Sequence, residues 1–370
     1  MKSKMSLSIL MMIFFVSASV PGCLFSDDAS TVSFKKCDDP DNCLTIAFET
    51  KEEYQNTEEN PQELADRLSE LLDMDVEIYP VDGAGATIQA LRFGKADIGF
   101  LDGGAAWLSW QNYDLQVLGA EQKQDGRPFY NAIAWVHKDS DMAQADMDDD
   151  PDTDPFALME GKKSCHTSAL GSSGMLLPMG WMIDRGYIEV VGDPDDIESL
   201  TDTVKNYFSE DSSIPDSGTK YHKYIGSLRC LAEGGKEVIS FAKDPTVPDY
   251  CGEDPEDWCF EGGFTSTEDF HGINYTGRDN GEGFGRAPSH PVMYNPEYMT
   301  ADQVTLLTDA LALMSKSPSD GGSQSDLDIL DAVFNTPGFT IINTEDHLGT
   351  YGTHIENVPG IQAYFEDKYD

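Results

Sequence analysis

The order of short apolar segments near the start of the chain limits its fold most strongly. The pattern predicts a strand at 44–48, a helix at about 60–72, a strand at 76–79, a helix at 84–93 and a strand at 96–100. Two strands joined through a helix lie parallel, and ligands of such open sheets collect at the carboxyl ends of the strands. Asp102 follows the third strand directly. It is therefore a candidate binding residue.

The length of the chain indicates two such units. Single cores usually stop growing at about 250 to 300 residues, and hydrophobic residues make up 39% of the chain, which indicates a packed globule. We expect a two-domain α/β fold with the ligand cleft between the domains. The expected parts are a signal peptide at 1–22, a lipidated N-terminus and tether at 23–43, a first domain at 44–128 plus 289–370, and a second domain at 129–288 with an irregular insertion at 249–285.

The first 22 residues have the pattern of an export signal. Lys2 and Lys4 precede an apolar run at 7–16, and small residues follow it. The run ends in Val-Pro-Gly-Cys, which resembles a lipobox with Cys23 as the lipidated N-terminus. Because Pro21 is unusual in such a motif, plain secretion is the alternative. We expect an extracytoplasmic protein, held at the membrane by a lipid anchor.

The charge balance excludes one class of partner. With 24 Lys and Arg against 67 Asp and Glu, the formal net charge is −43. A surface this anionic repels nucleic acid. Salt screens the self-repulsion within about 10 Å, so a saline habitat explains the charge without any function.

Six cysteines remain after Cys23, an even number that indicates disulfides in an oxidising compartment. The close spacings favour two local bridges, which leaves one long-range bridge. Metal ligation is the rival interpretation, but no pair has CxxC spacing. The expected pairs are Cys37 with Cys43, Cys251 with Cys259, and Cys165 with Cys230.

One segment has the pattern of an anion site. A strand ending at Cys165 leads into a loop of small residues and then into an apolar helix at 174–184. Backbone N–H groups at a helix start are unpaired, and the helix dipole favours negative charge there. Ordinary helix capping by Ser172 is the alternative. The candidate anion-binding residues are Thr167, Ser172, Ser173 and Gly174.

Several motifs, in order, resemble one transferrin lobe across about residues 44–300. They are GKKSCHT at 161–167 followed by Gly174 and Pro-Met-Gly at 178–180, YIGSLRCL at 224–231, RAPSH at 286–290, LDGG at 101–104 and FYNAIA at 129–134. The resemblance implies a single lobe whose long-range disulfide ties the anion segment to the strand region that bears Tyr224. It also implies iron ligands at Asp102, Tyr130, Tyr224 and His290.

The chemistry of these four residue types suits ferric iron. A hard cation prefers oxygen donors, and one carboxylate with two phenolates balances three positive charges. His290 adds a neutral bond, which leaves room for a bidentate anion. Taken singly, each residue has an ordinary structural role: a cap for Asp102, core aromatics for the tyrosines and a loop histidine. The resemblance therefore implies Fe(III) bound with carbonate or phosphate, and no catalytic residue.

The chain departs from the family at Gly171, where an arginine is expected to hold the carbonate. Phosphate or a monoanion such as bicarbonate is then an alternative, with Lys163 or Lys243 as sources of charge. The rival function is a substrate-binding lipoprotein of a phosphate, phosphite or phosphonate ABC transporter without metal, because 84–110 and Ser172-Ser173-Gly174 with Pro178 are similar to phosphonate-type periplasmic binding proteins. That function makes a membrane permease a partner. An enzyme is not expected, because the chain lacks HExxH, Walker, Rossmann and nucleophile-elbow motifs.

Overall fold

The protein is described here by a computed structural model that covers residues 35–39, 42–49, 61–148, 150, 152–277 and 282–369. The expected signal peptide and Cys23 lie outside these residues. Phe34–Asp370 forms one compact unit. Within the described ranges, no helix combines the length and the apolar character needed to cross a membrane.

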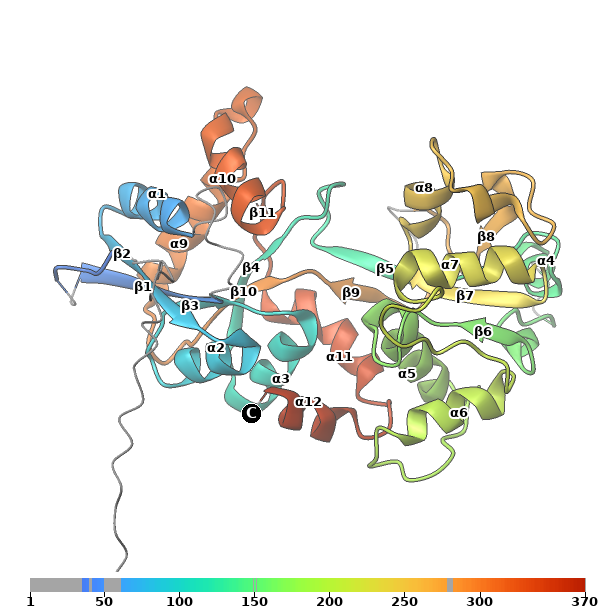
Figure 1. The fold of residues 1–370 in the computed structure, drawn as a ribbon. Helices are drawn as coiled ribbons and strands as arrows, with labels where there is room; N and C mark the ends of the chain where they lie inside the picture. The colour runs from blue at the N-terminus through green and yellow to red at the C-terminus, as the bar shows by residue number, and fades with distance from the viewer. Residues whose placement is uncertain are drawn as a thin grey trace, which may run out of the picture. The chain divides into compact units, whose positions relative to one another are not determined.

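A first, six-stranded sheet has the order β11-β4-β10-β3-β1-β2 (Figure 1). Strand β1 pairs in parallel with β2 and with β3, as the strand-helix-strand pattern predicted. Strand β10 runs antiparallel between β3 and β4. The strands are β1 (Cys43–Glu49), β2 (Asp75–Val81), β3 (Ile98–Phe100), β4 (Gln116–Glu121), β10 (Pro291–Tyr294) and β11 (Phe339–Thr340).

The helices beside this sheet follow from apolar spacing and caps. In α1, Leu64, Leu68 and Leu72 are buried on one face, as predicted. Helix α9 is closed at its start by a capping box between Thr300 and Gln303. The helices are α1 (Gln62–Leu72), α2 (Gly83–Arg92), α3 (Gly103–Tyr113), α9 (Ala301–Met314) and α10 (Gln324–Phe334).

A second sheet has the order β6-β7-β5-β8, and β9 pairs with β5 outside this path. Strand β5 is central and almost wholly buried. The strands of this sheet are β5 (Phe129–His137), β6 (Lys163–Cys165), β7 (Val238–Lys243), β8 (Phe270–Gly272) and β9 (Arg286–Pro288). The other α-helices are α4 (Asp141–Met147), α5 (Leu177–Asp184), α6 (Ser199–Tyr207), α7 (Lys223–Gly234), α8 (Thr246–Cys251), α11 (Thr350–Ile355) and α12 (Ile361–Tyr369). The first sheet takes strands from both ends of the chain and the second from between them. The residue boundaries of the two domains stay a proposal.

Two local expectations were wrong. The stretch 249–285 is not wholly irregular, because it supplies β8, whose Gly272 pairs with Trp135 of β5. Its hydrophobic residues Trp258, Phe264 and Phe270 are buried, and this burial stabilises the parts of the stretch that carry them. The helix expected from Gly174 starts earlier, with a wide π-helical turn at Ser172–Leu176 that leads into α5.

The three disulfides join the expected pairs, Cys37–Cys43, Cys165–Cys230 and Cys251–Cys259. Cys165 ends β6 and Cys230 lies in α7, so this bridge ties the anion segment to a helix. Tyr224 lies on the same helix. The expectation that Tyr224 belongs to a strand region was therefore wrong.

Candidate functional site

Tyr130 and Tyr224 come together although they are 94 positions apart in the sequence. Tyr130 lies near the start of β5, opposite Ala287 of β9, and Tyr224 lies in the first turn of α7. The Tyr224 hydroxyl donates to the Tyr130 hydroxyl at 3.4 Å, and the Ser173 hydroxyl donates to Tyr224 at 3.1 Å. Two neighbouring phenol oxygens can bind the same small ligand.

The start of α7 is held against the anion segment. Lys223 has a positive φ of 66°, which is uncommon for a residue with a side chain. Its N–H donates to the Thr167 carbonyl at 2.9 Å. This bond places Tyr224, the next residue, beside the loop that carries Ser172 and Ser173.

The phenol of Tyr130 is a weak acid in this environment. Burial raises the pKa of Tyr130 well above its ordinary value, and the neighbouring Tyr224 raises it further. The hydroxyl of Ser173 opposes this rise by hydrogen bonding. Without a bound cation Tyr130 therefore stays protonated, and a metal has to displace its proton.

The four candidate anion-binding residues lie together at the π-helical turn. Thr167 packs so closely against Gly171 and Gly174 that a side chain at either glycine would collide with it. Ser173 contacts Tyr224, and Ser172 contacts the hydroxyl of Tyr351 at 3.3 Å. The turn therefore gathers hydroxyl groups beside the tyrosine pair.

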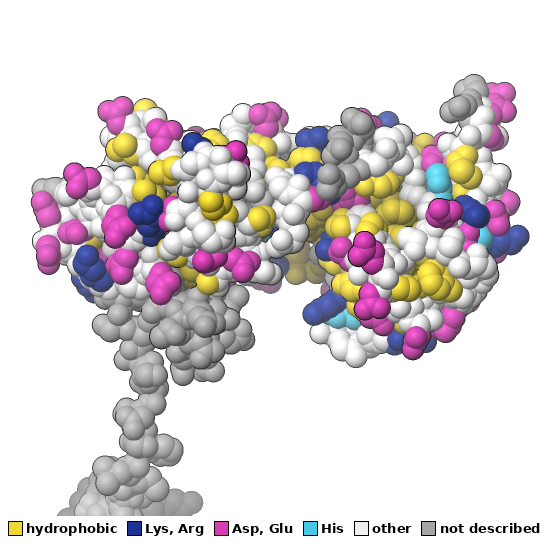
Figure 2. All heavy atoms as spheres, turned by 90° about the horizontal axis from the view of Figure 1, so that it is seen from above, with side chains coloured by type: hydrophobic (Ala, Val, Ile, Leu, Met, Phe, Trp, Pro, Cys, Tyr) yellow, Lys and Arg dark blue, Asp and Glu magenta, His cyan; other side chains and the backbone are white. Residues whose placement is uncertain are grey.

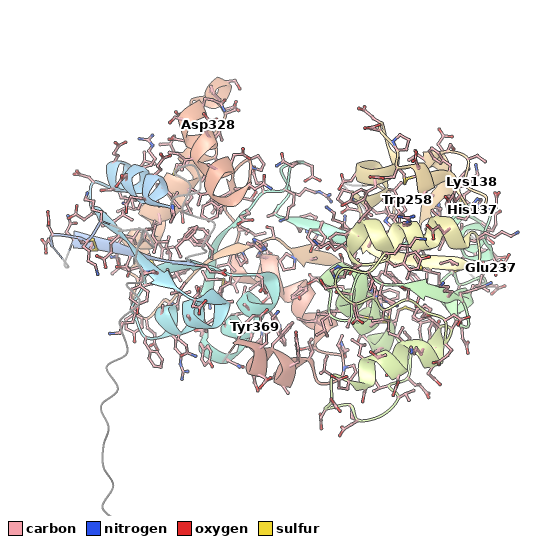
Figure 3. The ribbon with its side chains drawn as sticks, in the orientation of Figure 1. His137, Lys138, Glu237, Trp258, Asp328 and Tyr369 are labelled. Carbon is pink, nitrogen blue, oxygen red and sulfur yellow. A yellow bond between two sulfur atoms is a disulfide. The ribbon has the colours of Figure 1, made fainter. Side chains whose placement is uncertain are left out.

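Asp102 has two structural contacts at once. Its Oδ1 accepts from the Ala105 N–H at 2.9 Å and caps α3. Tyr369 lies at the end of α12 (Figure 3). Its hydroxyl donates to both Asp102 oxygens at 3.0 Å each. Asp102 thus has the helix-capping role that is the alternative to a ligand role. A metal would compete with Tyr369 for this carboxylate.

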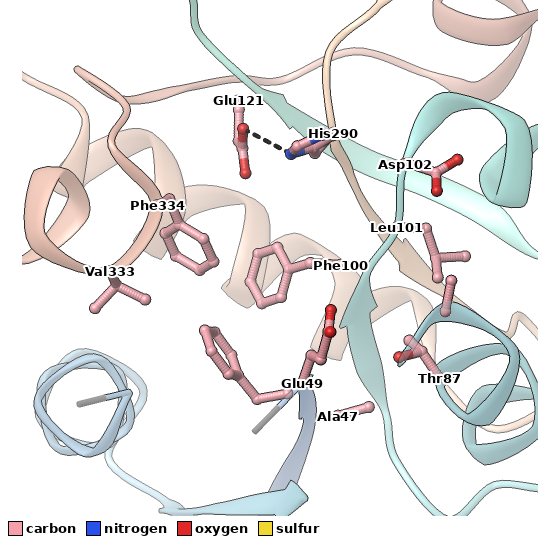
Figure 4. A pocket seen from close by; sticks show the side chains of 12 residues that line it. Ala47, Glu49, Thr87, Phe100, Leu101, Asp102, Glu121, His290, Val333 and Phe334 are labelled. Carbon is pink, nitrogen blue, oxygen red and sulfur yellow. Dashed lines mark ion pairs between the residues drawn. The ribbon is translucent and has the colours of Figure 1, made fainter. Parts of the chain in front are cut away.

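His290 lies between β9 and β10 and shares a pocket with Asp102 (Figure 4). Its Nδ1 is 3.3 Å from a carboxylate oxygen of Glu121, whose side chain is 8% exposed, whereas that of His290 is 55% exposed. The pocket holds about 300 Å³ and has Phe100 and Phe334 in its wall. Asp102 and His290 therefore face one pocket.

Tyr130 and Tyr224 line a different pocket of about 550 Å³. The structure thus places the four candidate ligands as two pairs, not as one set. Among the described residues, His, Cys, Asp and Glu gather to a possible three-ligand metal group only around Cys37, Cys43 and Glu77, and those cysteines form a disulfide. In this arrangement, a metal site with three protein ligands elsewhere in these residues therefore needs a donor of another type, such as a phenol.

The pocket of the tyrosine pair also holds three cationic side chains, Lys123, Arg127 and Lys243. The ammonium group of Lys243 lies 5.2 Å from the centre of the Tyr224 ring. Burial, with repulsion from Lys243, lowers the pKa of Lys123 although Glu121 opposes this. Acidic side chains are spread over the face of the molecule in Figure 2 and cationic ones are fewer, so a group of three is unusual in this chain.

Part of this charge is already neutralised. Arg127 lies 2.7 Å from Asp125 and 2.8 Å from Asp244. Lys243 lies 3.3 Å from Asp249. Lys163, the other cation considered from the sequence, lies on β6 and does not line this pocket. Lys123 and Lys243 are thus the two lysines of this pocket, and Lys243 is paired with Asp249.

Sequence reasoning missed Tyr351, Tyr369, Glu121 and Lys123. Tyr351 and Tyr369 follow the last recognisable motif by about 60 and 80 residues, and no spacing links them to the motifs. Glu121 ends a strand of the same sheet as Asp102. Its place at a strand end is the signal that could have identified it.

Comparison with known proteins agrees with this architecture. Residues 46–210 match the family described as "ABC transporter, phosphonate, periplasmic substrate-binding protein". Transferrin 2 of Drosophila melanogaster is 27% identical over 198 residues, 46% of this chain and 22% of that protein. Serotransferrin of Gadus morhua is 27% identical over 243 residues, 60% of this chain and 34% of that protein. The matches thus span about a third or less of these relatives.

Among solved structures, transferrin 1 from Manduca sexta is similar to this chain, with a TM-score of 0.57 and 15% identity over 87% of this chain and 47% of that one. This likeness confirms the two-domain fold of the type II periplasmic binding proteins. The families matched are binding-protein families found outside the cytoplasm, in agreement with the three disulfides. In sequence and in fold, the chain is thus similar to the superfamily of binding proteins that includes transferrin lobes and phosphonate-type periplasmic binding proteins.

Proposed function

We propose that this protein binds ferric iron together with a small oxyanion, for uptake or sequestration outside the cytoplasm. The observation that carries this proposal is the 3.4 Å approach of the Tyr130 and Tyr224 hydroxyls. Two phenolates side by side are hard, anionic donors of the kind that a ferric ion prefers. Asp102 and His290 are the proposed third and fourth ligands.

Binding by this set requires a rearrangement of contacts. Asp102 has to exchange the Tyr369 hydroxyl for the metal, whereas His290 can keep its Nδ1 beside Glu121 and bind the metal through Nε2. The two pockets would then have to close on one ion, because only a closed form lets all four side chains coordinate it. Loss of the two phenol protons makes this binding dependent on pH.

The proposed anion site is the π-helical turn with Thr167, Ser172, Ser173 and Gly174. Support comes from the close packing of Thr167 against Gly174 and from Ser173, whose hydroxyl donates to Tyr224. Carbonate and phosphate are both candidates. Lys123 and Lys243 supply positive charge on the pocket side of the phenols, where Gly171 supplies none.

Titration of the soluble part of the protein, started at Leu24, with ferric iron tests the proposal. Iron–phenolate bonds absorb visible light, so a band should appear with bicarbonate or phosphate present. It should weaken strongly in Tyr130→Phe, because one of the two phenolates is then gone. Absence of a band with both anions would contradict the iron proposal.

A receptor for phosphate, phosphite or phosphonate without metal is the second candidate. The observation that favours it is the pocket in which Lys123 and Lys243 lie beside the hydroxyls of Tyr130 and Tyr224, since all four groups can donate hydrogen bonds to an anion. Calorimetry of the iron-free protein with phosphate and with methylphosphonate tests it. Heat of binding without iron would support this candidate, and no heat would exclude it.

The proposed attachment is a lipid on Cys23, with a membrane permease as the partner in uptake. Metabolic labelling with a radioactive fatty acid should mark the full chain but not Cys23→Ser. Equal labelling of both would contradict the anchor.

A further inference from the structure

A third buried phenol lies at the candidate anion site. Tyr351 of α11 is 1% exposed, and its hydroxyl lies 3.3 Å from the Ser172 hydroxyl. Ser172 opens the π-helical turn, so the contact joins α11 to the start of the proposed anion site. Ser172 and Tyr351 are 179 positions apart, and the fold alone brings them together.

Helix α11 is held in this position by close packing on two sides. A side chain at Gly180 of α5 would collide with the carbonyl of His354, and a side chain at Gly352 would collide with the indole of Trp107 in α3. Helix α11 is thus pressed against α5 and α3. The first helical turn before α5 carries Ser172, and Asp102 caps α3.

The Tyr351 hydroxyl is a neutral hydrogen-bond donor. Burial raises the pKa of Tyr351, the Ser172 hydroxyl lowers it, and the charges of Asp102 and Tyr224 raise it further. These groups therefore lie near the Tyr351 phenol. A phenol that keeps its proton can donate to an oxyanion but cannot offset its charge.

With Thr167 in its present side-chain conformation, there is no room for a cationic side chain at this turn. A side chain at Gly171 or at Gly174 would collide with the Thr167 hydroxyl. An extra donor for a bound anion therefore has to come from another element. Tyr351 is the buried side chain whose hydroxyl already reaches this turn.

Resting on the proposed function, we propose that Tyr351 is a specificity-determining residue of the anion site. Its hydroxyl and that of Ser172 donate to the oxyanion in place of a cationic side chain. Neutral donors leave a buried dianion uncompensated. The site therefore prefers an oxyanion of single charge that keeps a proton of its own, such as hydrogencarbonate or dihydrogen phosphate, over an obligate dianion such as sulfate.

The experiment measures the anion concentration that gives half of the visible iron band at fixed ferric iron. Sulfate, which has the shape of phosphate without its proton, should need at least about ten-fold more than phosphate. Tyr351→Phe should raise the half-saturating phosphate about 10- to 100-fold, the range for a hydrogen bond to a charged group. The wavelength of the band should stay unchanged, since Tyr130 and Tyr224 remain.

Tyr207→Phe is the matched control, because it removes another phenol hydroxyl. Tyr207 lies on α6, and its hydroxyl donates to the Phe156 carbonyl at 3.0 Å. It should leave the half-saturating phosphate as in the wild type. Ser172→Ala is a second variant that keeps Tyr351 and should raise the phosphate requirement as well. In the double variant Ser172→Ala/Tyr351→Phe, the half-saturating phosphate should rise by less than the product of the two single-variant fold-changes.

The outcomes separate the two proposals. No band in the wild type with any anion overturns the proposed function. A wild-type band with unchanged phosphate requirement in both Tyr351→Phe and Ser172→Ala overturns only the role of Tyr351. Sulfate acting as well as phosphate overturns the preference for a single charge.

Discussion

Removal of one phenol hydroxyl by Tyr224→Phe should weaken ferric iron binding far more than it weakens the fold. Tyr224 is a proposed ligand, and even residues that only support metal ligands cost about 10- to 100-fold in affinity when changed. Loss of an anionic oxygen donor should therefore exceed about 100-fold. The iron band should weaken in proportion, because one of its two phenolates is gone.

The cost to the fold is small by comparison. The Tyr224 hydroxyl takes part in two neutral hydrogen bonds, at 3.1 Å to Ser173 and 3.4 Å to Tyr130. Each is worth about 0.5 to 1.5 kcal/mol, so the free energy of unfolding should fall by about 1 to 3 kcal/mol without iron. The phenyl ring keeps its packing against Tyr130.

The assay is a competitive titration, in which citrate buffers the ferric iron and the visible band reports occupancy. Tyr187→Phe is the control. The Tyr187 hydroxyl donates to Asp154 at 2.9 Å, and neither residue is a candidate ligand. It should bind iron as the wild type does. Equal iron affinity in Tyr224→Phe and the wild type would refute the assignment of Tyr224 as a ligand.

Three further predictions concern an ion pair, a disulfide and a buried histidine. Glu121→Gln should lower iron affinity about 10- to 100-fold, because the carboxylate orients His290; unchanged affinity in the same titration would contradict this. Replacing both Cys165 and Cys230 by Ala should cost about 4 kcal/mol in urea denaturation, because the bridge spans 65 positions, and a loss below about 1 kcal/mol would contradict it. Burial lowers the pKa of His166 to about 4. As the pH falls below 6.5, His166 is therefore protonated in the unfolded chain before it is protonated in the folded one, and the free energy of unfolding should fall by about 3 kcal/mol from pH 6.5 to pH 4. A His166 NMR signal that titrates near pH 6.5 in the folded protein would contradict this.

Local patterns in the sequence predicted the parallel strands because each strand and helix has its own apolar spacing. Strands β1, β2 and β3 and the helices between them are examples. The disulfides were predictable for a similar reason, since two pairs are close in sequence and one pair remained. Tyr130 and Tyr224 were predicted as site residues through family motifs, whereas Ser173 was predicted from the local pattern of a helix start. Whether they bind iron stays a prediction.

Contacts between distant segments without motifs could not be predicted. The bond from Tyr369 to Asp102 joins residues 267 positions apart, and its pairing depends on how α12 packs against α3. The placement of Tyr224 on a helix was missed because the apolar run at 224–231 fits a strand or a buried helix equally well. The closed space at Gly171 depends on the rotamer of Thr167, which no sequence pattern specifies.

The measurement that tests the central claim most directly is anomalous X-ray diffraction at the iron absorption edge, on crystals grown with ferric iron and phosphate. We predict one strong anomalous peak within bonding distance of the Tyr130 and Tyr224 phenol oxygens, with Asp102 and His290 completing the set and anion density at Ser172 and Ser173. A tetrahedral anion between the tyrosines and Lys243 without any anomalous peak would contradict the iron site and establish the metal-free receptor.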